Sequence, residues 1–148
     1  MNILAPVASI MSKSLITVNP EDKLTTVKNI FDTHSIHHLP VVRYKQMVGM
    51  ISASDMLYFL RGFTGSLQSQ LMDEARLQAF RAEDIMTTGL AKLSSKDSIR
   101  TALDVFKVNR FHALPVIDED ELVGILTTYD IIKALAETPI SLDDYKDQ

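Results

Sequence analysis

The spacing of apolar residues along the chain alternates between that of helices and that of strands, and the same succession occurs twice. Apolar side chains recur every three or four positions, as on the buried face of a helix, first at Leu24, Val27, Ile30 and Phe31 and again at Ile99, Ala102, Val105 and Phe106. Asp22 and Asp97 precede these segments, and we expect their carboxylates to cap the two helices.

Short apolar runs around a polar tetrapeptide follow each predicted helix. Leu39–Val42 and Met47–Ile51 flank Arg43–Gln46, and Leu114–Ile117 and Leu122–Leu126 flank Asp118–Glu121, which predicts two β-hairpins. A strand candidate precedes each first helix (Leu15–Val18, Leu90–Leu93), and a second helix closes each stretch (about Ala53–Arg61, Thr128–Ala136). The predicted order is therefore β-α-β-β-α, twice.

The two stretches are copies of one sequence at a constant offset of 75 residues. The matching segments are Ile10-Met11-Ser12 with Ile85-Met86-Thr87, His37 with His112, Leu39-Pro40-Val41 with Leu114-Pro115-Val116, Val48-Gly49 with Val123-Gly124, and Asp55 with Asp130. No gap interrupts the register, so the chain contains an internal duplication.

The duplication predicts a mixed fold, α/β (α+β), built from two β-α-β-β-α repeats. We expect repeat 1 in residues 1–62, a connecting loop and helix in 63–82, repeat 2 in 83–137 and an acidic tail in 138–148. Because a repeat of about 50 residues buries its helices and sheet poorly alone, we expect the two to pack face to face with pseudo-two-fold symmetry.

The connecting segment is predicted to contain a loop and a helix. Gly62–Ser66 is typical of a loop, and Leu67–Ala82 is predicted to be helical, with Leu67, Leu71 and Ala75 on one side. The helix and the acidic tail are the segments that we expect to contact a partner protein.

Composition excludes several classes of protein. The 148 residues carry a net charge of −4, of which residues 137–148 contribute −3, so the nearly neutral body has no broad basic field for nucleic acid. The chain has no cysteine, no apolar run of membrane-spanning length and no signal-peptide pattern, so we expect a cytoplasmic protein without disulfides.

The junction between each predicted hairpin and the helix after it carries the most informative polar residues. Ser52 and Asp55, and likewise Thr127 and Asp130, place a hydroxyl at a helix start and a carboxylate one turn later. The hydroxyl and the free N–H groups of the helix suit an anion such as phosphate, and the carboxylate suits the vicinal hydroxyls of a ribose. A capping box, in which the same side chains only satisfy the helix N-terminus, is the alternative interpretation.

Glycine precedes each of these junctions, and histidine enters each hairpin. Gly49 and Gly124 permit close approach of a ligand or of another backbone. His37 and His112 are candidates to contact a phosphate, the alternative being partly exposed packing residues. A metal site at His34, His37 and His38 is not expected, because the second copy keeps only His112.

No nucleophile, phosphate-binding loop or dinucleotide fingerprint is present, so we expect no enzymatic activity and no obligatory cofactor.

The paired units resemble cystathionine-β-synthase (CBS) domains, and the tandem is similar to a CBS pair, or Bateman module. The motifs that carry the resemblance are Ile-Met-[Ser/Thr], His-x-Leu-Pro-Val and Gly-x-x-[Ser/Thr]-x-x-Asp, each present in both copies between about Val7 and Leu135. The resemblance implies adenosine ligands (AMP, ADP, ATP, S-adenosylmethionine or a dinucleotide such as NAD) in clefts between the repeats, and a homodimer assembled through helices.

The resemblance also implies a role for particular residues. Asp55 and Asp130 would receive ribose hydroxyls, Ser52 and Thr127 would lie near ribose or phosphate, and His37 and His112 match a phosphate-contacting histidine of the AMP-activated protein kinase gamma subunit. The segments bordering the adenine would be Ile16, Thr17 and Val18 in one copy and Ala91, Lys92 and Leu93 in the other. The kinase subunit often has Arg where this chain has His38 and Ala113, so we expect AMP or ADP to bind more tightly than ATP.

The sequence therefore predicts a stand-alone regulatory protein that binds an adenosine nucleotide and signals energy or ligand status to an unidentified partner. Two alternatives stay open: a ligand-free module for dimerisation or partner docking, and a sensor of S-adenosylmethionine or NAD.

Overall fold

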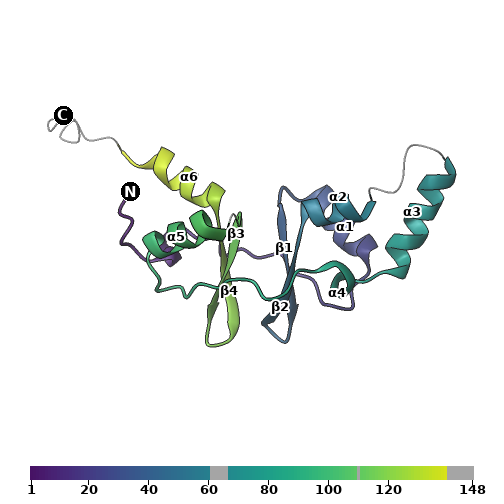
Figure 1. Ribbon diagram of the computed structural model, residues 1–148, viewed down its shortest axis with the longest axis horizontal. Coiled ribbons are helices and arrows are strands. Elements are labelled where there is room, and N and C mark those ends of the chain that lie inside the picture. The colour runs from purple at the N-terminus through teal and green to yellow at the C-terminus, as the bar shows by residue number, and fades with distance from the viewer. Residues whose placement is uncertain (61–66, 110, 140–148) are drawn as a thin grey trace. The chain divides into compact units, whose positions relative to one another are not determined.

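The computed structural model describes residues 1–60, 67–109 and 111–139 (Figure 1). The predicted loop Gly62–Ser66 and nearly all of the acidic tail lie outside these residues. The elements are a 3₁₀ turn at Val7–Ser9, α1 (Leu24–Thr33), β1 (His38–Arg43), β2 (Gln46–Ser52), α2 (Ala53–Leu60), α3 (Leu67–Ala79), α4 (Ala82–Ile85), α5 (Ile99–Asn109), β3 (Ala113–Asp118), β4 (Glu121–Thr127) and α6 (Thr128–Glu137). None of the helices in these ranges is long and apolar enough to cross a membrane.

Each copy forms one antiparallel hairpin with a helix before it and a helix after it, which confirms the predicted mixed fold of two repeats. The hairpins turn through two residues in left-handed conformation, Tyr44 and Lys45 in one and Glu119 and Asp120 in the other. Such turns match the twist of the flanking strands, so the polar tetrapeptides are hairpin tips as predicted.

The strand candidates before α1 and α5 are shorter than predicted. Val18 forms a single parallel bridge to Val41, and Leu93 forms the equivalent bridge to Val116. The side chains of Val18 and Leu93 are buried, and the backbone of each makes two hydrogen bonds to its hairpin, so burial and this short bridge hold the segments beside the hairpins.

The prediction that Asp22 and Asp97 cap α1 and α5 is wrong. Asp22 accepts a hydrogen bond from the backbone N–H of Asn19, and Asp97 accepts one from Ser94, so both carboxylates close the turn before the helix. The Ser98 hydroxyl instead accepts the N–H of Thr101 at the start of α5.

The chain divides into two compact units that do not coincide with the two copies. One unit contains residues 1–14, 91–118 and 123–148, and the other contains 15–90 and 119–122. The segment that leads each copy therefore packs with the body of the other copy.

Backbone hydrogen bonds tie each leading segment to its unit. The N–H of Val7 donates to the Asp97 carbonyl (2.7 Å) and the N–H of Ala82 donates to the Asp22 carbonyl (2.8 Å). Further along, Ser12 exchanges two backbone hydrogen bonds with Ile125, and Thr87 exchanges two with Met50. Positions 7 and 82, like 12 and 87, are equivalent in the duplication, so the exchange is symmetrical.

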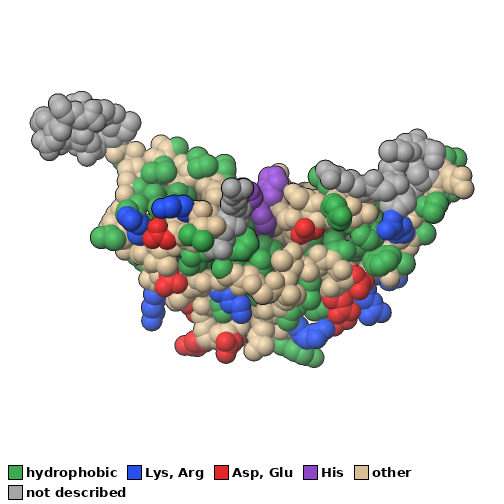
Figure 2. Space-filling view, viewed as in Figure 1, with side chains coloured by type: hydrophobic (Ala, Val, Ile, Leu, Met, Phe, Trp, Pro, Cys, Tyr) green, Lys and Arg blue, Asp and Glu red, His purple; other side chains and the backbone are tan. Residues whose placement is uncertain are grey.

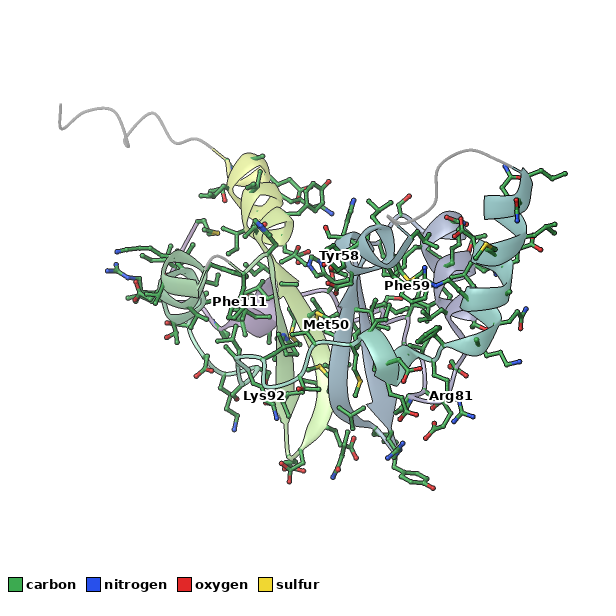
Figure 3. The ribbon with its side chains drawn as sticks, turned by 45° about the vertical axis from the view of Figure 1, so that its right-hand side comes forward. Met50, Tyr58, Phe59, Arg81, Lys92 and Phe111 are labelled. Atoms are coloured by element: carbon green, nitrogen blue, oxygen red, sulfur yellow. The ribbon has the colours of Figure 1, made fainter. Side chains whose placement is uncertain are left out.

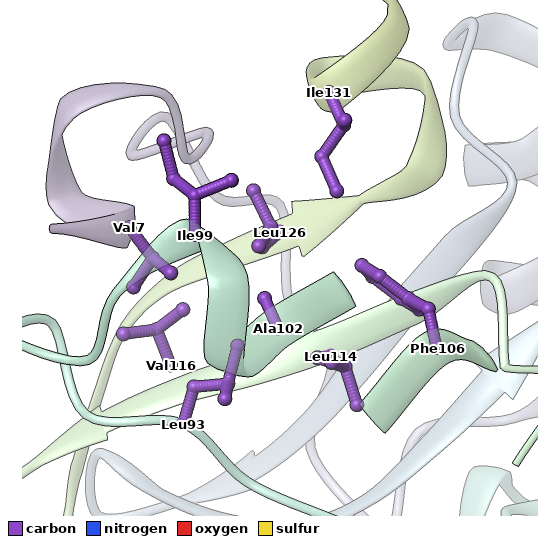
Figure 4. Packing of buried hydrophobic residues seen from close by; sticks show 9 residues of the cluster. All are labelled: Val7, Leu93, Ile99, Ala102, Phe106, Leu114, Val116, Leu126 and Ile131. Carbon is purple, nitrogen blue, oxygen red and sulfur yellow. The ribbon is translucent and has the colours of Figure 1, made fainter. Parts of the chain in front are cut away.

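The two hydrophobic cores share eight equivalent positions and differ in Phe106 of one and Leu77 of the other. The core of the first-described unit contains Val7, Leu93, Ile99, Ala102, Phe106, Leu114, Val116, Leu126 and Ile131 (Figure 4). The core of the other contains Val18, Leu24, Val27, Leu39, Val41, Ile51, Met56, Leu77 and Ala82. Val7 and Ala82 are the buried residues that each core receives from the leading segment of the other copy.

The side of the connecting helix formed by Leu67, Leu71 and Ala75 is exposed, and the helix packs through another side. It ends at Ala79 rather than Ala82, and its Leu77 is buried, whereas Leu67 and Leu71 are 76% and 62% exposed. Phe80, just after the helix, makes an edge-to-face contact at 5.3 Å between ring centroids with Phe59 of α2, which is labelled in Figure 3. This aromatic contact and Leu77 hold α3 on the 15–90 unit.

Candidate nucleotide-binding sites

Two candidate sites follow from the predicted residues, and each lies within one compact unit. We define the first candidate site as Ile16, Thr17, Val18, His37, Ser52 and Asp55, and the second as Ala91, Lys92, Leu93, His112, Thr127 and Asp130.

The start of α2 is held by a reciprocal pair of hydrogen bonds. The N–H of Asp55 donates to the Ser52 hydroxyl (3.1 Å), and the N–H of Ser52 donates to Oδ2 of Asp55 (2.7 Å). The Ser52 oxygen thus acts as acceptor here, which leaves its hydroxyl proton available for donation. The capping interpretation is correct for these two residues, but capping engages only one carboxylate oxygen.

The start of α6 has the same box with further hydrogen bonds. Both the N–H and the hydroxyl of Thr127 donate to Oδ2 of Asp130 (2.7 and 2.6 Å), and the N–H of Asp130 donates to the Thr127 hydroxyl oxygen (3.2 Å). The Ser12 hydroxyl donates to the other oxygen, Oδ1, at 3.1 Å. Ser12 belongs to the repeated Ile-Met-[Ser/Thr] motif, and nothing in the sequence indicates that its hydroxyl reaches Asp130.

Both predicted histidines lie beside these helix starts. The carbonyl of His37 accepts the N–H of Ala53 (2.9 Å), and the carbonyl of His112 accepts that of Thr128 (3.1 Å). Both side chains are exposed, and histidine side chains reach the surface on the face shown in Figure 2. The hairpin register, His38 opposite Ser52, is what brings His37 next to the helix start.

The three neighbouring histidines of the first copy do not converge. Nδ1 of His34 lies 3.0 Å from the Thr33 hydroxyl and 3.2 Å from the Ile30 carbonyl, at the end of α1. Within the described part of the chain no three histidine or acidic side chains are grouped as metal ligands would be.

The segments predicted to border an adenine approach the same end of each hairpin through parallel bridges. Val18 and Leu93 are core residues, and the backbone N–H and carbonyl of each are paired with the neighbouring strand, so neither offers a free polar group to a ligand. The side chains of Thr17 and Lys92 are exposed, and Lys92 extends from the surface in Figure 3.

The glycine before each site serves packing within the protein. A Cβ built on Gly49 would lie 2.5 Å from Sδ of Met86, and one on Gly124 would lie 2.6 Å from Sδ of Met11. The close approach expected at these glycines is therefore made by a methionine from the other copy's leading segment. The Ile-Met-[Ser/Thr] motif of each copy thus packs against the Val-Gly motif of the other copy.

The family model of the CBS domain matches this chain twice, at residues 7–62 and 82–137. A CBS domain-containing protein of Dictyostelium discoideum is 30% identical over 134 residues, which cover 87% of this chain and 90% of that protein. Inosine-5'-monophosphate dehydrogenase of Methanocaldococcus jannaschii is 29% identical over 126 residues, 84% of this chain. The chain spans only 22% of that enzyme's length, and 45% of another relative from the same organism.

Solved structures of paired CBS domains have the same fold. CBSX2, a CBS-pair protein of Arabidopsis thaliana solved in complex with AMP, superposes with a TM-score of 0.73 at 23% identity, covering 89% of this chain and 96% of CBSX2. The CBS domain pair of protein MJ0100, solved with 5'-methylthioadenosine and S-adenosylmethionine, gives a TM-score of 0.71 at 23% identity, covering 90% and 97%. Identities this low establish the fold alone.

Proposed function

Because the chain belongs to the CBS domain family, we propose that it is a regulatory module that binds an adenosine nucleotide and passes its occupancy to a partner protein. In this proposal the nucleotide binds at the candidate sites, and its role is regulatory rather than catalytic. The cytoplasmic location expected from the sequence remains a prediction.

The Asp55 carboxylate is the observation that carries the proposal. Its Oδ2 is fixed by the N–H of Ser52, so the group has one orientation, and Oδ1 has no hydrogen-bond partner among the described residues. An oriented carboxylate oxygen at a half-buried position suits the two hydroxyls of a ribose, because both hydroxyls can donate to it.

The groups around Asp55 suit the rest of a nucleotide. The Ser52 hydroxyl proton, the exposed His37 ring and the N-terminus of α2 can each favour a phosphate oxygen. The exposed Thr17 and the half-buried Ile16 offer a surface of mixed polarity for a base. Two CBS pairs of the same fold were solved with ligands that contain adenosine, which supports the choice of this moiety.

The proposal favours AMP or ADP over ATP. His38 and Ala113 occupy the positions after the two site histidines, so no fixed guanidinium stands there to balance a triphosphate. S-adenosylmethionine and NAD share the adenosine moiety and are the competing ligands.

Isothermal titration with AMP, ADP, ATP, S-adenosylmethionine and NAD tests the proposal. Asp55→Asn and Asp130→Asn are the informative variants, since an amide keeps one oxygen for the cap but replaces the other with an N–H donor. We expect each variant to lose one site and the double variant to lose both. Asp84→Asn is the matched control, because Asp84 accepts the Arg81 N–H in a capping box at α4, outside both sites.

Unchanged affinity in the double variant would show the ribose assignment to be wrong. Tightest binding by ATP would contradict the preference for AMP or ADP. A second measurement, the rise of the melting temperature with ligand concentration, follows from binding to the folded state alone.

Exposed apolar side chains on α2 and α6 favour a second function, dimerisation or partner docking with empty sites. Leu57 and Tyr58 on α2 are 67% and 75% exposed, and Ile132 on α6 is 62% exposed. Exposed apolar side chains grouped on one helix mark interaction sites. If the ligand panel produces no thermal shift while sedimentation shows a dimer that Leu57→Glu or Ile132→Glu dissociates, the docking function holds.

A further inference from the structure

The two ribose-accepting carboxylates differ in how fully the protein itself occupies them. Asp130 accepts two hydrogen bonds from Thr127 on Oδ2 and one from the Ser12 hydroxyl on Oδ1. Asp55 accepts the Ser52 N–H on Oδ2, and the described residues provide no donor to its Oδ1. At Asp130 the protein therefore already fills one acceptor position of the oxygen that is open at Asp55.

The difference lies in side chains and not in the backbone. Thr87 is the residue equivalent to Ser12, and its backbone pairs with Met50 as that of Ser12 pairs with Ile125. The segments that deliver Ser12 and Thr87 are therefore placed alike, each on its own unit. In the described ranges the Thr87 hydroxyl makes no hydrogen bond to Asp55, whereas the Ser12 hydroxyl reaches Asp130.

We propose that the two sites are unequal, that the Asp55 site takes the first ligand, and that Ser12 lowers the affinity of the Asp130 site by competing for Oδ1. This inference rests on the function proposed above. A ribose that donates both hydroxyls to Oδ1 of Asp130 needs both acceptor positions of that oxygen, and Ser12 already holds one of them, so the ribose must displace the Ser12 hydroxyl. A hydrogen bond to a charged group is worth enough to weaken binding about tenfold. Ser12, which belongs to the leading segment of the first copy, thus lowers the affinity of the Asp130 site, which belongs to the second copy.

The same contact couples the Asp130 site to the N-terminal segment. The backbone of Ser12 is held by its hydrogen bonds to Ile125 and by the packing of the neighbouring Met11 on Gly124. The Ser12 hydroxyl can therefore rotate away from Asp130 while the segment stays packed on β4. Ligand occupancy at Asp130 then changes the hydrogen bonding of residues 1–14, whereas occupancy at Asp55 does not change that of the equivalent Thr87.

The test isolates one site at a time with AMP as the probe. In the Asp55→Asn background only the Asp130 site remains, and we expect AMP to bind it about tenfold more weakly than it binds the Asp55 site in the Asp130→Asn background. Adding Ser12→Ala to Asp55→Asn should recover the tenfold loss, whereas Ser12→Thr, which keeps the hydroxyl, should not.

Thr87→Ala in the Asp130→Asn background is the matched control, and its AMP affinity should change less than twofold. Ser12→Val provides a second variant without the hydroxyl, and circular dichroism confirms that each variant is folded. Equal affinities in the two single-Asp backgrounds, or no gain from either Ser12→Ala or Ser12→Val, would overturn the inequality while the proposed function stands. Absence of AMP binding to the wild-type protein, or binding that the double Asp→Asn variant retains, would overturn the proposed function and this inference together.

Discussion

Gly49 in β2 lies directly under Met86, so that a Cβ added to the glycine would come within 2.5 Å of Sδ, 2.7 Å of Cγ and 3.0 Å of Cβ of the methionine. Met86 belongs to the segment that leads the second copy, and Gly49 belongs to the body of the first. The contact explains why the same two motifs recur together in both copies. A side chain at position 49 would force the leading segment away from the sheet.

Gly49→Ala should therefore destabilise the protein by about 1–3 kcal/mol, as overpacked sites do. Gly124→Ala should cost less, because the atoms it meets, Sδ, Cε and Cγ of Met11, lie toward the flexible end of that side chain. Chemical denaturation of both variants gives the comparison. Adding Met11→Ala should relieve the clash at Gly124 fully, whereas Met86→Ala should relieve that at Gly49 only in part; equal costs at both glycines would contradict the explanation.

The exchanged leading segments make a prediction about fragments. Residues 15–90 contain the hairpin and helices of one unit together with Leu77 and Ala82, whereas residues 1–62 lack both of these core residues. Loss of a buried leucine alone costs about 2–5 kcal/mol, a large fraction of the stability of a small domain. We expect the 15–90 fragment to unfold cooperatively on heating and the 1–62 fragment to show no transition. A cooperative transition in 1–62 would mean that the copy, not the compact unit, is the folding unit.

The hairpin tips predict stabilising substitutions. Tyr44 and Lys45 adopt φ values of 50° and 66°, a conformation that costs a residue with a Cβ about 1–2 kcal/mol and glycine almost nothing. Replacing the pair by Asn-Gly should stabilise the protein by roughly 1 kcal/mol, after allowing for the greater freedom of glycine in the unfolded chain. Replacing Gly89, whose φ is 68°, by alanine should destabilise the protein, although the added Cβ would meet no neighbouring atom. A fall in melting temperature for the Asn-Gly variant would refute this account.

Charged groups at the turns before α1 and α5 predict how stability responds to acid. Hydrogen bonds from Ser95 and from the Ser94 hydroxyl hold the pKa of Asp118 below its ordinary value, and Glu21, bonded to its own backbone N–H and to Arg43, also has a lowered pKa. A carboxyl whose pKa falls on folding stabilises the protein above its unfolded pKa, and this contribution is lost as the pH falls through the folded value.

We therefore expect the stability to be constant from neutral pH down to about pH 5 and to decline below about pH 4.5, because these carboxylates there begin to take up protons in the unfolded chain before they do so in the folded protein. Asp118→Asn should lower the melting temperature at pH 7, and the difference from the wild type should vanish in strong acid. Asp104→Asn, which removes an exposed partner of Arg100 within α5, is the control and should have little effect at either pH. A difference for Asp118→Asn that persists in strong acid would contradict the assignment.

Local patterns predicted most of the elements because they depend on neighbours in sequence. The period of Leu24, Val27 and Ile30 corresponds to α1, and the polar tips correspond to the two hairpin turns. The predicted caps of α1 and α5 were wrong because Asp22 and Asp97 lie one residue before the N-cap position. From there each carboxylate closes the preceding turn instead. The buried side of α3 was not predicted, because contacts with Phe59 and with the 15–90 core decide it, and a helical period alone does not contain them.

The sequence by itself determined the duplication, the order of elements in each copy, and the pairing of a hydroxyl with a carboxylate at the start of α2 and of α6. The tertiary structure decided which copy each leading segment packs against. Gly49 and Gly124 have the same local sequence, so the sequence alone does not show that Met11 packs on Gly124 and not on Gly49. It also decided that Ser12 engages Asp130 while the equivalent Thr87 leaves Asp55 open. A repeated pattern is symmetric by construction, so only long-range packing distinguishes one copy's partner from the other's.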